Sequence, residues 1–298
     1  MLLKQAKSLL CFFFAIFSFT ANAITVKDAQ GEFTINYQPK RIVALEYSFV
    51  DALANVGVSP IGVADDKDKT RILQSVRDKI NDWQSVGTRS QPSLEAIAEL
   101  KPDLIIADQN RHSAVYNELK KIAPTLLLKS RQETYQENLV SAQTIADVVG
   151  KSEQMRQRIK AHNEKIAAIS KTLPKVHAMI GISRENQFLI TTNESYTGSL
   201  LEALGFIVDK PLNSKNKANN PAGLEQLAAS NPAWLVIVHY RDESITKKWA
   251  DEPLWQALTA VQKHQLINTN DSALWTRSRG LDAAEQIAQI LQTAILKE

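Results

Sequence analysis

Two stretches of the chain, residues 93–106 (SLEAIAELKPDLII) and residues 223–238 (GLEQLAASNPAWLVIV), share one pattern. Each has Leu-Glu at the start of a short helix-forming segment, then a turn marked by proline, then a continuous apolar run. This order predicts a helix followed by a buried strand. Because the unit occurs twice, it predicts two lobes of similar build, with Glu95 and Glu225 in equivalent positions.

Strands and helices are predicted to alternate around both copies. Apolar runs at residues 41–45, 59–63 and 125–128 surround the first copy, and runs at residues 176–182 and 266–267 surround the second. Apolar strands without period-two alternation, separated by helices, are typical of parallel sheets covered on both faces. The predicted fold class is therefore α/β, with two lobes that contain mainly parallel sheets covered by helices.

Residues 151–173 separate the two predicted lobes. The segment is rich in Lys, Glu, Gln, Arg and Ala and contains neither Gly nor Pro. A helix of about 20 residues spans about 30 Å, which is the width of a small domain. We interpret it as a linker helix between an N-terminal lobe, residues 24–150, and a C-terminal lobe, residues 174–298, with a ligand cleft between them. A surface helix of one lobe is the alternative.

Residues 1–23 have the composition of a secretory signal peptide. Lys4 and Lys7 precede an apolar run at residues 9–19, and Ala21-Asn22-Ala23 is a small-residue cleavage site. The run is shorter than the roughly 20 residues that a membrane span needs. We therefore expect a leader that is removed, and no membrane insertion.

The rest of the chain excludes several classes of function. Without the leader, 33 Lys and Arg residues stand against 32 Asp and Glu, a net charge of +1. A nearly neutral chain gives no electrostatic reason to expect nucleic acid as a partner. The single cysteine, Cys11, lies in the leader, so no thiol nucleophile remains. No GxSxG, P-loop or GxGxxG motif occurs, and we predict that the protein is not an enzyme.

Several pieces of the sequence, taken in order, carry a family resemblance. These are residues 41–46 with 51–53, Val86–Thr88 before the first copy, the two copies themselves, residues 251–258, and Trp275 with Gly280 before the last helix. The chain resembles the periplasmic substrate-binding proteins of iron-chelate and cobalamin ABC importers. That resemblance implies a periplasmic monomer that delivers a small iron chelate to an ABC permease of the inner membrane.

Residues 86–89, 111–112, 239–241 and 275–280 make a closer match to the members of that family that bind ferric dicitrate. The implied ligand is therefore iron(III) complexed with citrate. Another iron siderophore, haem and metal-free citrate remain the alternatives.

Arginines follow the predicted strands of both lobes, at the edge where ligands bind in open α/β folds. A guanidinium group is permanently charged and grips a carboxylate with two hydrogen bonds, which suits the free carboxylates of a citrate complex. The alternative for any one arginine is a surface ion pair of little energetic weight. The candidates are Arg89, Arg111 and Arg131 in the first lobe, and Arg184, Arg241, Arg277 and Arg279 in the second.

Three aromatic residues, Tyr47, Tyr196 and Trp275, are candidates for polar or stacking contacts with the ligand, although Trp275 equally suits a core position. Of the histidines, His112 and His239 follow strand ends, but no close histidine pair or HExxH spacing occurs. We therefore expect no protein metal site, and expect the citrates to hold the iron.

Two acidic features remain. Glu95 and Glu225 each lie in the first turn of a predicted helix, where the helix dipole favours a carboxylate. The family resemblance adds a docking role, in which each pairs with arginines of the permease. Asp65, Asp66 and Asp68 lie in a Lys-rich segment without EF-hand spacing, and we interpret them as part of a solvated loop.

Overall fold

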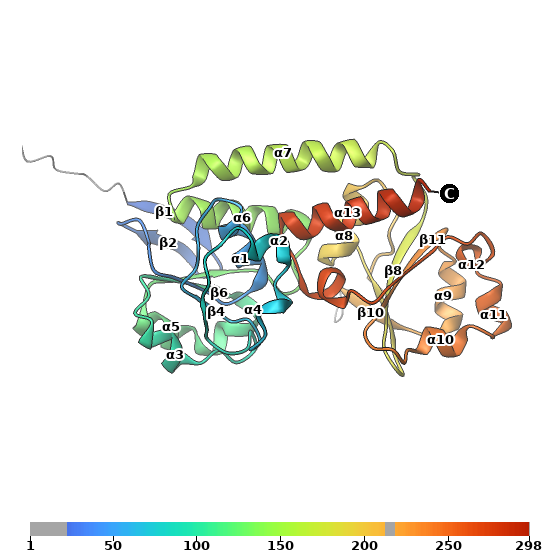
Figure 1. Cartoon of the computed structure of the whole chain (residues 1–298), viewed down its shortest axis with the longest axis horizontal. Helices are drawn as coiled ribbons and strands as arrows, with labels where there is room; N and C mark the ends of the chain where they lie inside the picture. The colour runs from blue at the N-terminus through green and yellow to red at the C-terminus, as the bar shows by residue number, and fades with distance from the viewer. Residues whose placement is uncertain (1–22, 212–217, 298) are drawn as a thin grey trace, which may run out of the picture.

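The computed structural model describes residues 23–211 and 218–297, which form two lobes side by side beneath a long helix (Figure 1). The predicted signal peptide, residues 1–23, lies outside the described residues except for Ala23. Among the described residues, no helix combines the length and the apolar character needed to cross a bilayer.

The first lobe is built on a five-stranded sheet of order β5-β4-β3-β6-β7, in which all neighbouring strands are parallel. Alternate residues of its central strands pack on opposite faces: Ile42 and Ile106 lie in one apolar core, and Val43 and Ile105 lie in the other. Because helices cover both faces, these strands are apolar throughout, which is the pattern that predicted them. The strands are β3 (Ile42–Ala44), β4 (Gly62–Val63), β5 (Gln84–Ser85), β6 (Leu104–Asp108) and β7 (Thr125–Leu128).

The helical segments of this lobe follow or precede those strands. They are α1 (Tyr47–Ala54), the 3₁₀ turn η1 (Lys69–Arg71), α2 (Gln74–Arg77), α3 (Leu94–Glu99), α4 (Gln109–His112), the 3₁₀ turn η2 (Ser113–Val115), α5 (Tyr116–Ile122) and α6 (Tyr135–Val148).

The second lobe repeats this plan with a mixed sheet of order β10-β9-β8-β11-β12. Strands β8 (Ala178–Ser183), β11 (Trp234–His239) and β12 (Leu266–Thr269) are parallel, whereas β9 (Phe188–Thr191) is antiparallel to both β8 and β10 (Asn219–Ala222). Its helical segments are α8 (Tyr196–Ala203), α9 (Leu224–Ser230), α10 (Ile245–Trp249), α11 (Pro253–Gln256), α12 (Thr259–Gln262), the π-helical turn η3 (Ala273–Arg277) and α13 (Leu281–Ile295). The predicted α/β class with mainly parallel sheets is confirmed.

The two copies of the repeated unit occupy equivalent places. Helix α3 precedes β6, which lies between β3 and β7, and helix α9 precedes β11, which lies between β8 and β12. A helix that connects two parallel strands begins at the carboxyl edge of the sheet, since it runs back against them. The first turns of α3 and α9 therefore lie at the strand edges that border the space between the lobes.

The sequence did not reveal five of the strands. A hairpin of β1 (Ile24–Asp28) and β2 (Gly31–Ile35) precedes the first sheet, and β5, β9 and β10 were also missed. Strands β1, β2, β5 and β10 are partly exposed, so they lack the continuous apolar run that identifies a covered parallel strand. Strand β9 is mostly buried, but it has only four residues and lies antiparallel between β8 and β10.

Helix α7 (Ser152–Ser170) runs across both lobes at the top of Figure 1. Arg158 Nε of α7 donates a hydrogen bond to Asn55 Oδ1 beside α1 (2.8 Å), and Lys165 pairs with Glu285 of α13 (2.9 Å). The helix is thus bonded to the first lobe and to the last helix of the chain. The domain boundaries at residues 150 and 174, and the role of the segment as a linker, stay predictions.

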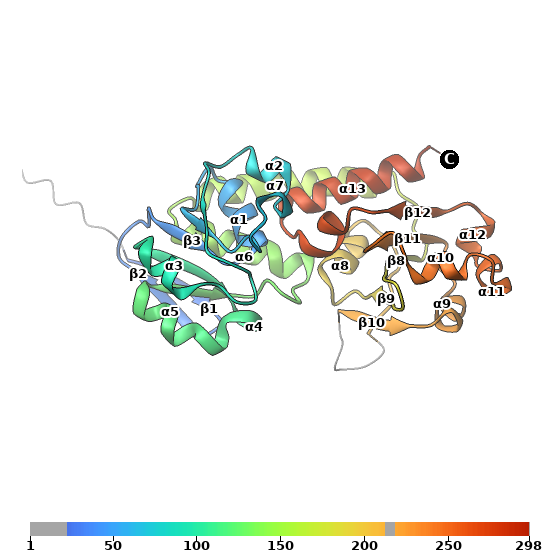
Figure 2. The same ribbon diagram turned by 60° about the horizontal axis from the view of Figure 1, so that its bottom comes forward.

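The lobes also contact each other directly, where α6 adjoins α8 and α1 adjoins α13 (Figure 2). Leu53 of α1, Ile145 of α6, Leu200 of α8 and Ile287 of α13 belong to one continuous buried core. Packed cores resist sliding because displaced side chains leave voids. We therefore expect only small changes in the angle between the lobes.

A carboxylate from the first lobe caps the helix that ends the second. Asp51 of α1 accepts hydrogen bonds from the backbone N–H groups of Leu281 (2.8 Å) and Asp282 (3.2 Å) at the start of α13. Gly280, just before the helix, has a φ of 129°, and a Cβ there would lie 2.3 Å from Asp51 Cγ. Only glycine combines that backbone angle with this close approach.

Replacing Asp51 with asparagine is expected to flatten the pH dependence of stability. Burial, with a further contribution from the Asp282 carboxylate, raises the pKa of Asp51 to about 7. The folded state therefore binds the proton more tightly than the unfolded state, and the free energy of unfolding falls as pH rises from about 4 to about 7, by at most about 4 kcal/mol from this group. Urea unfolding at both ends of this range measures it, with the exposed Asp251→Asn as control. An unchanged slope in Asp51→Asn would contradict the prediction.

Candidate functional site

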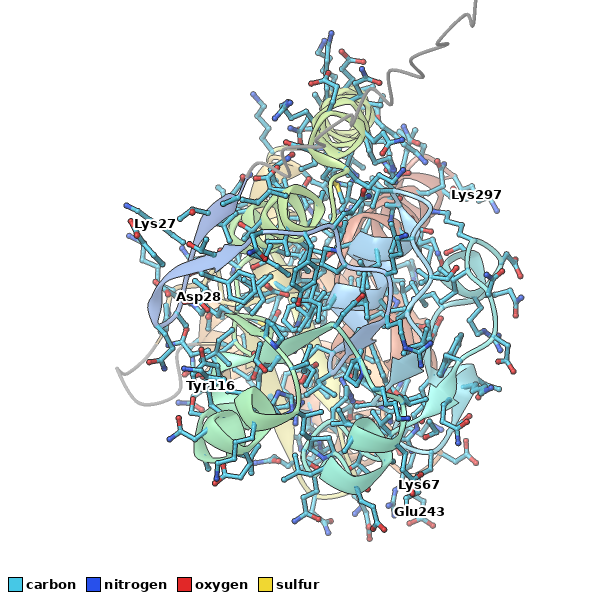
Figure 3. The ribbon with its side chains drawn as sticks, turned by 90° about the vertical axis from the view of Figure 1, so that its left-hand side faces the viewer. Lys27, Asp28, Lys67, Tyr116, Glu243 and Lys297 are labelled. Carbon is cyan, nitrogen blue, oxygen red and sulfur yellow. The ribbon has the colours of Figure 1, made fainter. Side chains whose placement is uncertain are left out.

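A cleft of about 710 Å³ lies between the lobes, where loops that follow strands of both sheets meet. Figure 3 shows that Lys67, in the loop after β4, and Glu243, in the loop after β11, both lie on the side of the molecule away from α7. The walls of the cleft are rich in guanidinium groups, and its arginines are Arg71, Arg89, Arg111, Arg131, Arg184, Arg241, Arg277 and Arg279.

All seven arginines that the sequence singled out therefore border one cavity, and their contact with a ligand stays a prediction. Arg71 was missed because it lies in the 3₁₀ turn η1 rather than directly after a strand. The signal that could have found it is its position close to the acidic segment around Asp66, with which it pairs (3.2 Å).

Arg89 is held in place by the protein. Its Nη2 donates a hydrogen bond to Asp66 Oδ2 (2.8 Å), its backbone N–H donates to Asp66 Oδ1 (2.8 Å), and its guanidinium lies 3.9 Å from the centre of the Tyr47 ring. Burial on its own would raise the pKa of Asp66, but the hydrogen bonds from Arg89 hold that pKa well below its ordinary value. Tyr47, a candidate for ligand contact, instead supports Arg89 and is 3% exposed.

The acidic segment is only partly a solvated loop. Asp65 is fully buried and accepts hydrogen bonds from Trp83 Nε1 (3.1 Å) and from the backbone N–H of Lys67 (3.0 Å). The interpretation as a solvated loop was wrong for Asp65, which bonds within the fold, and for Asp66, which pairs with Arg89, whereas Asp68 is exposed.

Arg111 lies over a second buried carboxylate. Its Nε is 2.5 Å from Glu46 Oε1, and Arg89 Nη1 is 3.7 Å from Glu46 Oε2. These are charge contacts without the geometry of directional hydrogen bonds. Burial raises the pKa of Glu46, and the charges of Arg111, Arg89 and Arg279 partly offset that effect. Glu46 thus anchors the floor of the cleft beneath two of its arginines.

A third buried carboxylate fixes the loops that carry Arg111 and Arg131. Asp108, at the end of β6, accepts backbone hydrogen bonds from Arg111 (2.7 Å) through Oδ1 and from Ser130 (2.8 Å) and Arg131 (2.9 Å) through Oδ2. One side chain therefore sets the backbone position of two loops, while the Arg111 guanidinium is directed by Glu46.

The remaining cleft arginines differ from Arg89 and Arg111. Within residues 23–211 and 218–297, no ion pair is formed by Arg131, Arg184, Arg241, Arg277 or Arg279. Arg184 and Arg277 lie 5.0 and 5.2 Å from the centre of the Tyr240 ring, and Arg277 donates a hydrogen bond to the Tyr240 hydroxyl (3.1 Å). Several cations in one cleft that form no ion pair with another described residue favour an anionic ligand.

A smaller chamber of about 210 Å³ shares Arg131, Thr276 and Arg279 with the cleft, and Tyr196 and Trp275 are among its other lining residues. The Tyr196 hydroxyl donates a hydrogen bond to the Gly280 carbonyl (2.5 Å) and accepts one from the Gly280 N–H (3.1 Å), so it is engaged at the start of α13. Trp275 is 1% exposed, and both residues border the chamber rather than the open cleft.

The two histidines at strand ends are engaged within the fold. His112 Nδ1 accepts the Asp108 N–H (2.8 Å) and its Nε2 bonds the Arg89 carbonyl (2.7 Å), while His239 bonds Ser244 and Asn268. Burial lowers the pKa of His112. In the part of the chain that the structure describes, no group of three or more His, Cys, Asp or Glu residues could hold a metal ion.

Glu95 and Glu225 lie outside the cleft. Each is the second residue of its helix, α3 or α9, and each is exposed. Neither forms an ion pair with another described residue. They are equivalent exposed charges at the rim of the cleft, one on each lobe.

The two-lobe geometry corresponds to a known family. The model of the family described as periplasmic binding protein matches residues 42–273. The chain belongs to that family. The Fe(3+) dicitrate-binding periplasmic protein FecB of Escherichia coli is 55% identical over 269 residues, which cover 90% of this chain and 89% of FecB. The Fe(3+)-citrate-binding protein YfmC of Bacillus subtilis is 40% identical, over 89% of this chain and 83% of YfmC.

Solved structures share the fold. Staphylococcus aureus SirA, in complex with staphyloferrin B, has a TM-score of 0.80 at 24% identity and covers 91% of this chain and 98% of SirA. The petrobactin-binding protein YclQ of Bacillus subtilis has a TM-score of 0.76 at 25% identity, over 93% of this chain and 99% of YclQ. Both the family and the names of these relatives describe binding proteins, so the prediction that the chain is not an enzyme is confirmed.

Proposed function

We propose that this protein is a periplasmic receptor that captures an iron(III)–citrate complex in the arginine cleft and, as a monomer, delivers it to an ABC permease of the inner membrane. The observation that carries the proposal is the group of five cleft arginines without an ion pair among the described residues, Arg131, Arg184, Arg241, Arg277 and Arg279. FecB and YfmC, both similar over most of their length, are named for binding of the same ligand class.

The chemistry of the cleft suits a citrate complex of iron(III). Some citrate carboxylates coordinate the iron. Those that remain free are planar anionic groups, each of which a guanidinium group binds through two hydrogen bonds. Because the citrates supply the ligands of the iron, the protein needs no metal-binding side chain of its own. Arg89 and Arg111 already pair with Asp66 and Glu46, so the arginines that form no ion pair with another described residue contribute most of the attraction.

Haem fits this cavity less well. Its large apolar faces need hydrophobic walls, whereas Ile182 and Leu189 are the aliphatic residues that line the cleft. Metal-free citrate carries the same carboxylates, and it has to be separated from the iron complex by experiment.

A titration followed by tryptophan fluorescence tests the proposed ligand. Trp275 lies next to the cleft wall, so its fluorescence is expected to report binding. Ferric citrate is expected to saturate that signal at a lower concentration than any comparison ligand. Citrate alone, haem and a ferric hydroxamate siderophore serve as the comparison ligands. Equal or tighter binding of any of these three would overturn the assignment of ferric citrate as the preferred cargo.

A further inference from the structure

The chamber beside the cleft contains three buried polar atoms that have no hydrogen-bond partner among the described residues. They are Trp275 Nε1, Ser278 Oγ and Glu133 Oε2. Their side chains are nearly inaccessible, with Trp275 1%, Ser278 4% and Glu133 0% exposed. Buried polar groups are almost always paired in native proteins, because an unpaired one costs about 1–3 kcal/mol. The three residues that carry these atoms all line one small chamber, which indicates a built site for a polar group.

Local structure holds these atoms in place. Trp275 lies in the π-helical turn Ala273–Arg277, which ends where the Ser278 N–H donates to the Ala273 carbonyl (2.8 Å). Such wide turns occur frequently at functional sites. Glu133 is fixed from the other lobe, because Asn138 Nδ2 donates a hydrogen bond to its Oε1 (2.9 Å) and leaves Oε2 for the chamber.

The chamber is rich in donors. The indole N–H of Trp275 can only donate, the Ser278 hydroxyl can donate, and Arg279 adds a cation at the wall shared with the cleft. Burial raises the pKa of Glu133 well above its ordinary value, against the opposing charge of Arg279. Donors converging from several sides match an acceptor such as a carboxylate.

The size of the chamber limits what it can take. Its volume of about 210 Å³ is less than a third of the 710 Å³ of the cleft, so it has room for an arm of a chelate and not for the chelate body. We propose that the inner chamber, bounded by Glu133, Trp275, Ser278 and Arg279, binds one carboxylate arm of the ligand that the metal leaves free. This subsite rests on the proposed function, since the chelate body occupies the adjoining cleft.

The variants Trp275→Phe and Ser278→Ala test the subsite, because each removes a donor. Ser278→Ala nearly keeps the volume of the residue, whereas Trp275→Phe also removes one ring. With ferric citrate as the probe in calorimetry, each is expected to weaken binding about tenfold, the effect of losing one hydrogen bond to a charged group. The free Ser278→Ala variant should unfold at the same urea concentration as the wild type or a higher one, because Ser278 Oγ has no hydrogen-bond partner among the described residues. Trp275→Phe leaves a smaller ring in the core, so it is judged on affinity alone. Glu133→Gln, which supplies an uncharged amide donor, should retain binding.

The outcomes separate this subsite from the proposed function. If the wild type does not bind ferric citrate, the proposed function fails. If the wild type binds and both Trp275→Phe and Ser278→Ala bind equally well, the chamber holds no ligand arm and only the subsite is overturned. Loss of stability in the free Ser278→Ala variant would likewise overturn it, since it would assign this hydroxyl a role in the fold.

Discussion

The double variant Arg184→Gln, Arg277→Gln is expected to bind ferric citrate at least about 100-fold more weakly than the wild type, with nearly unchanged stability. A hydrogen bond to a charged group contributes about 1.5–3 kcal/mol, or roughly a factor of ten to one hundred for each arginine. Both guanidinium groups adjoin the Tyr240 ring and form no ion pair with another described residue. Their removal therefore leaves no buried carboxylate without its counter-charge.

The affinity of this variant should also depend less on salt, because part of the long-range attraction is lost. Calorimetry at low and at physiological ionic strength measures both effects. Arg156→Gln is the matched control, since Arg156 is exposed on α7 and pairs with Glu153 of the same helix. Wild-type affinity in the double variant would remove Arg184 and Arg277 from the binding surface.

Arg89→Gln should have the opposite profile. Arg89 neutralises Asp66 and approaches Glu46, and both carboxylates have little contact with water. Removing one partner of a buried pair costs about 3–5 kcal/mol. Urea unfolding should therefore show a large loss of stability in Arg89→Gln and almost none in the Arg184, Arg277 double variant. If the two variants lost stability equally, the division of the cleft into anchored and unpaired arginines would be wrong.

The second large effect concerns delivery, and it extends the proposed function to the rim. We expect Glu95→Ala with Glu225→Ala to abolish most ferric citrate uptake in a strain that lacks its own binding protein, while the purified variant binds the ligand normally. The two carboxylates are exposed, equivalent in the two lobes and placed at the sheet edges that border the cleft. A transporter that contacts both lobes can bind the two carboxylates at the same time, and complementary charges set the orientation and rate of docking.

The control for docking uses acidic residues of the same exposure at other places. Glu99→Ala with Glu252→Ala removes one exposed carboxylate from each lobe and should leave uptake near the wild-type rate. Radioactive iron supplied as the citrate complex measures the uptake. Unchanged transport by the Glu95, Glu225 variant, or equal loss in the control, would refute the docking role of these residues.

The arginine positions could be predicted because they depend on local order along the chain. An apolar run followed by Arg184 or by Arg111 indicates a strand and the loop at its carboxyl end, and parallel strands bring such loops to one edge. Arg71 escaped this reasoning because no strand precedes it directly. Tyr196 and Trp275 were also chosen from local sequence order. The fold places the Tyr196 hydroxyl at the start of α13 and the Trp275 ring beside the inner chamber.

By itself the sequence determined the two-lobe α/β plan and seven of the eight arginines that line the cleft, since periodicity and strand ends are local properties. Only the tertiary structure decided which of those arginines carry free charge. Arg89 meets Asp66 and Arg111 meets Glu46 across loops that are distant along the chain, whereas Arg184 and Arg277 gather around Tyr240. The physical reason is that charge pairing depends on the separation of the charges in space. The repeated helix–turn–strand units of residues 93–106 and 223–238 constrain that separation only through the complete fold.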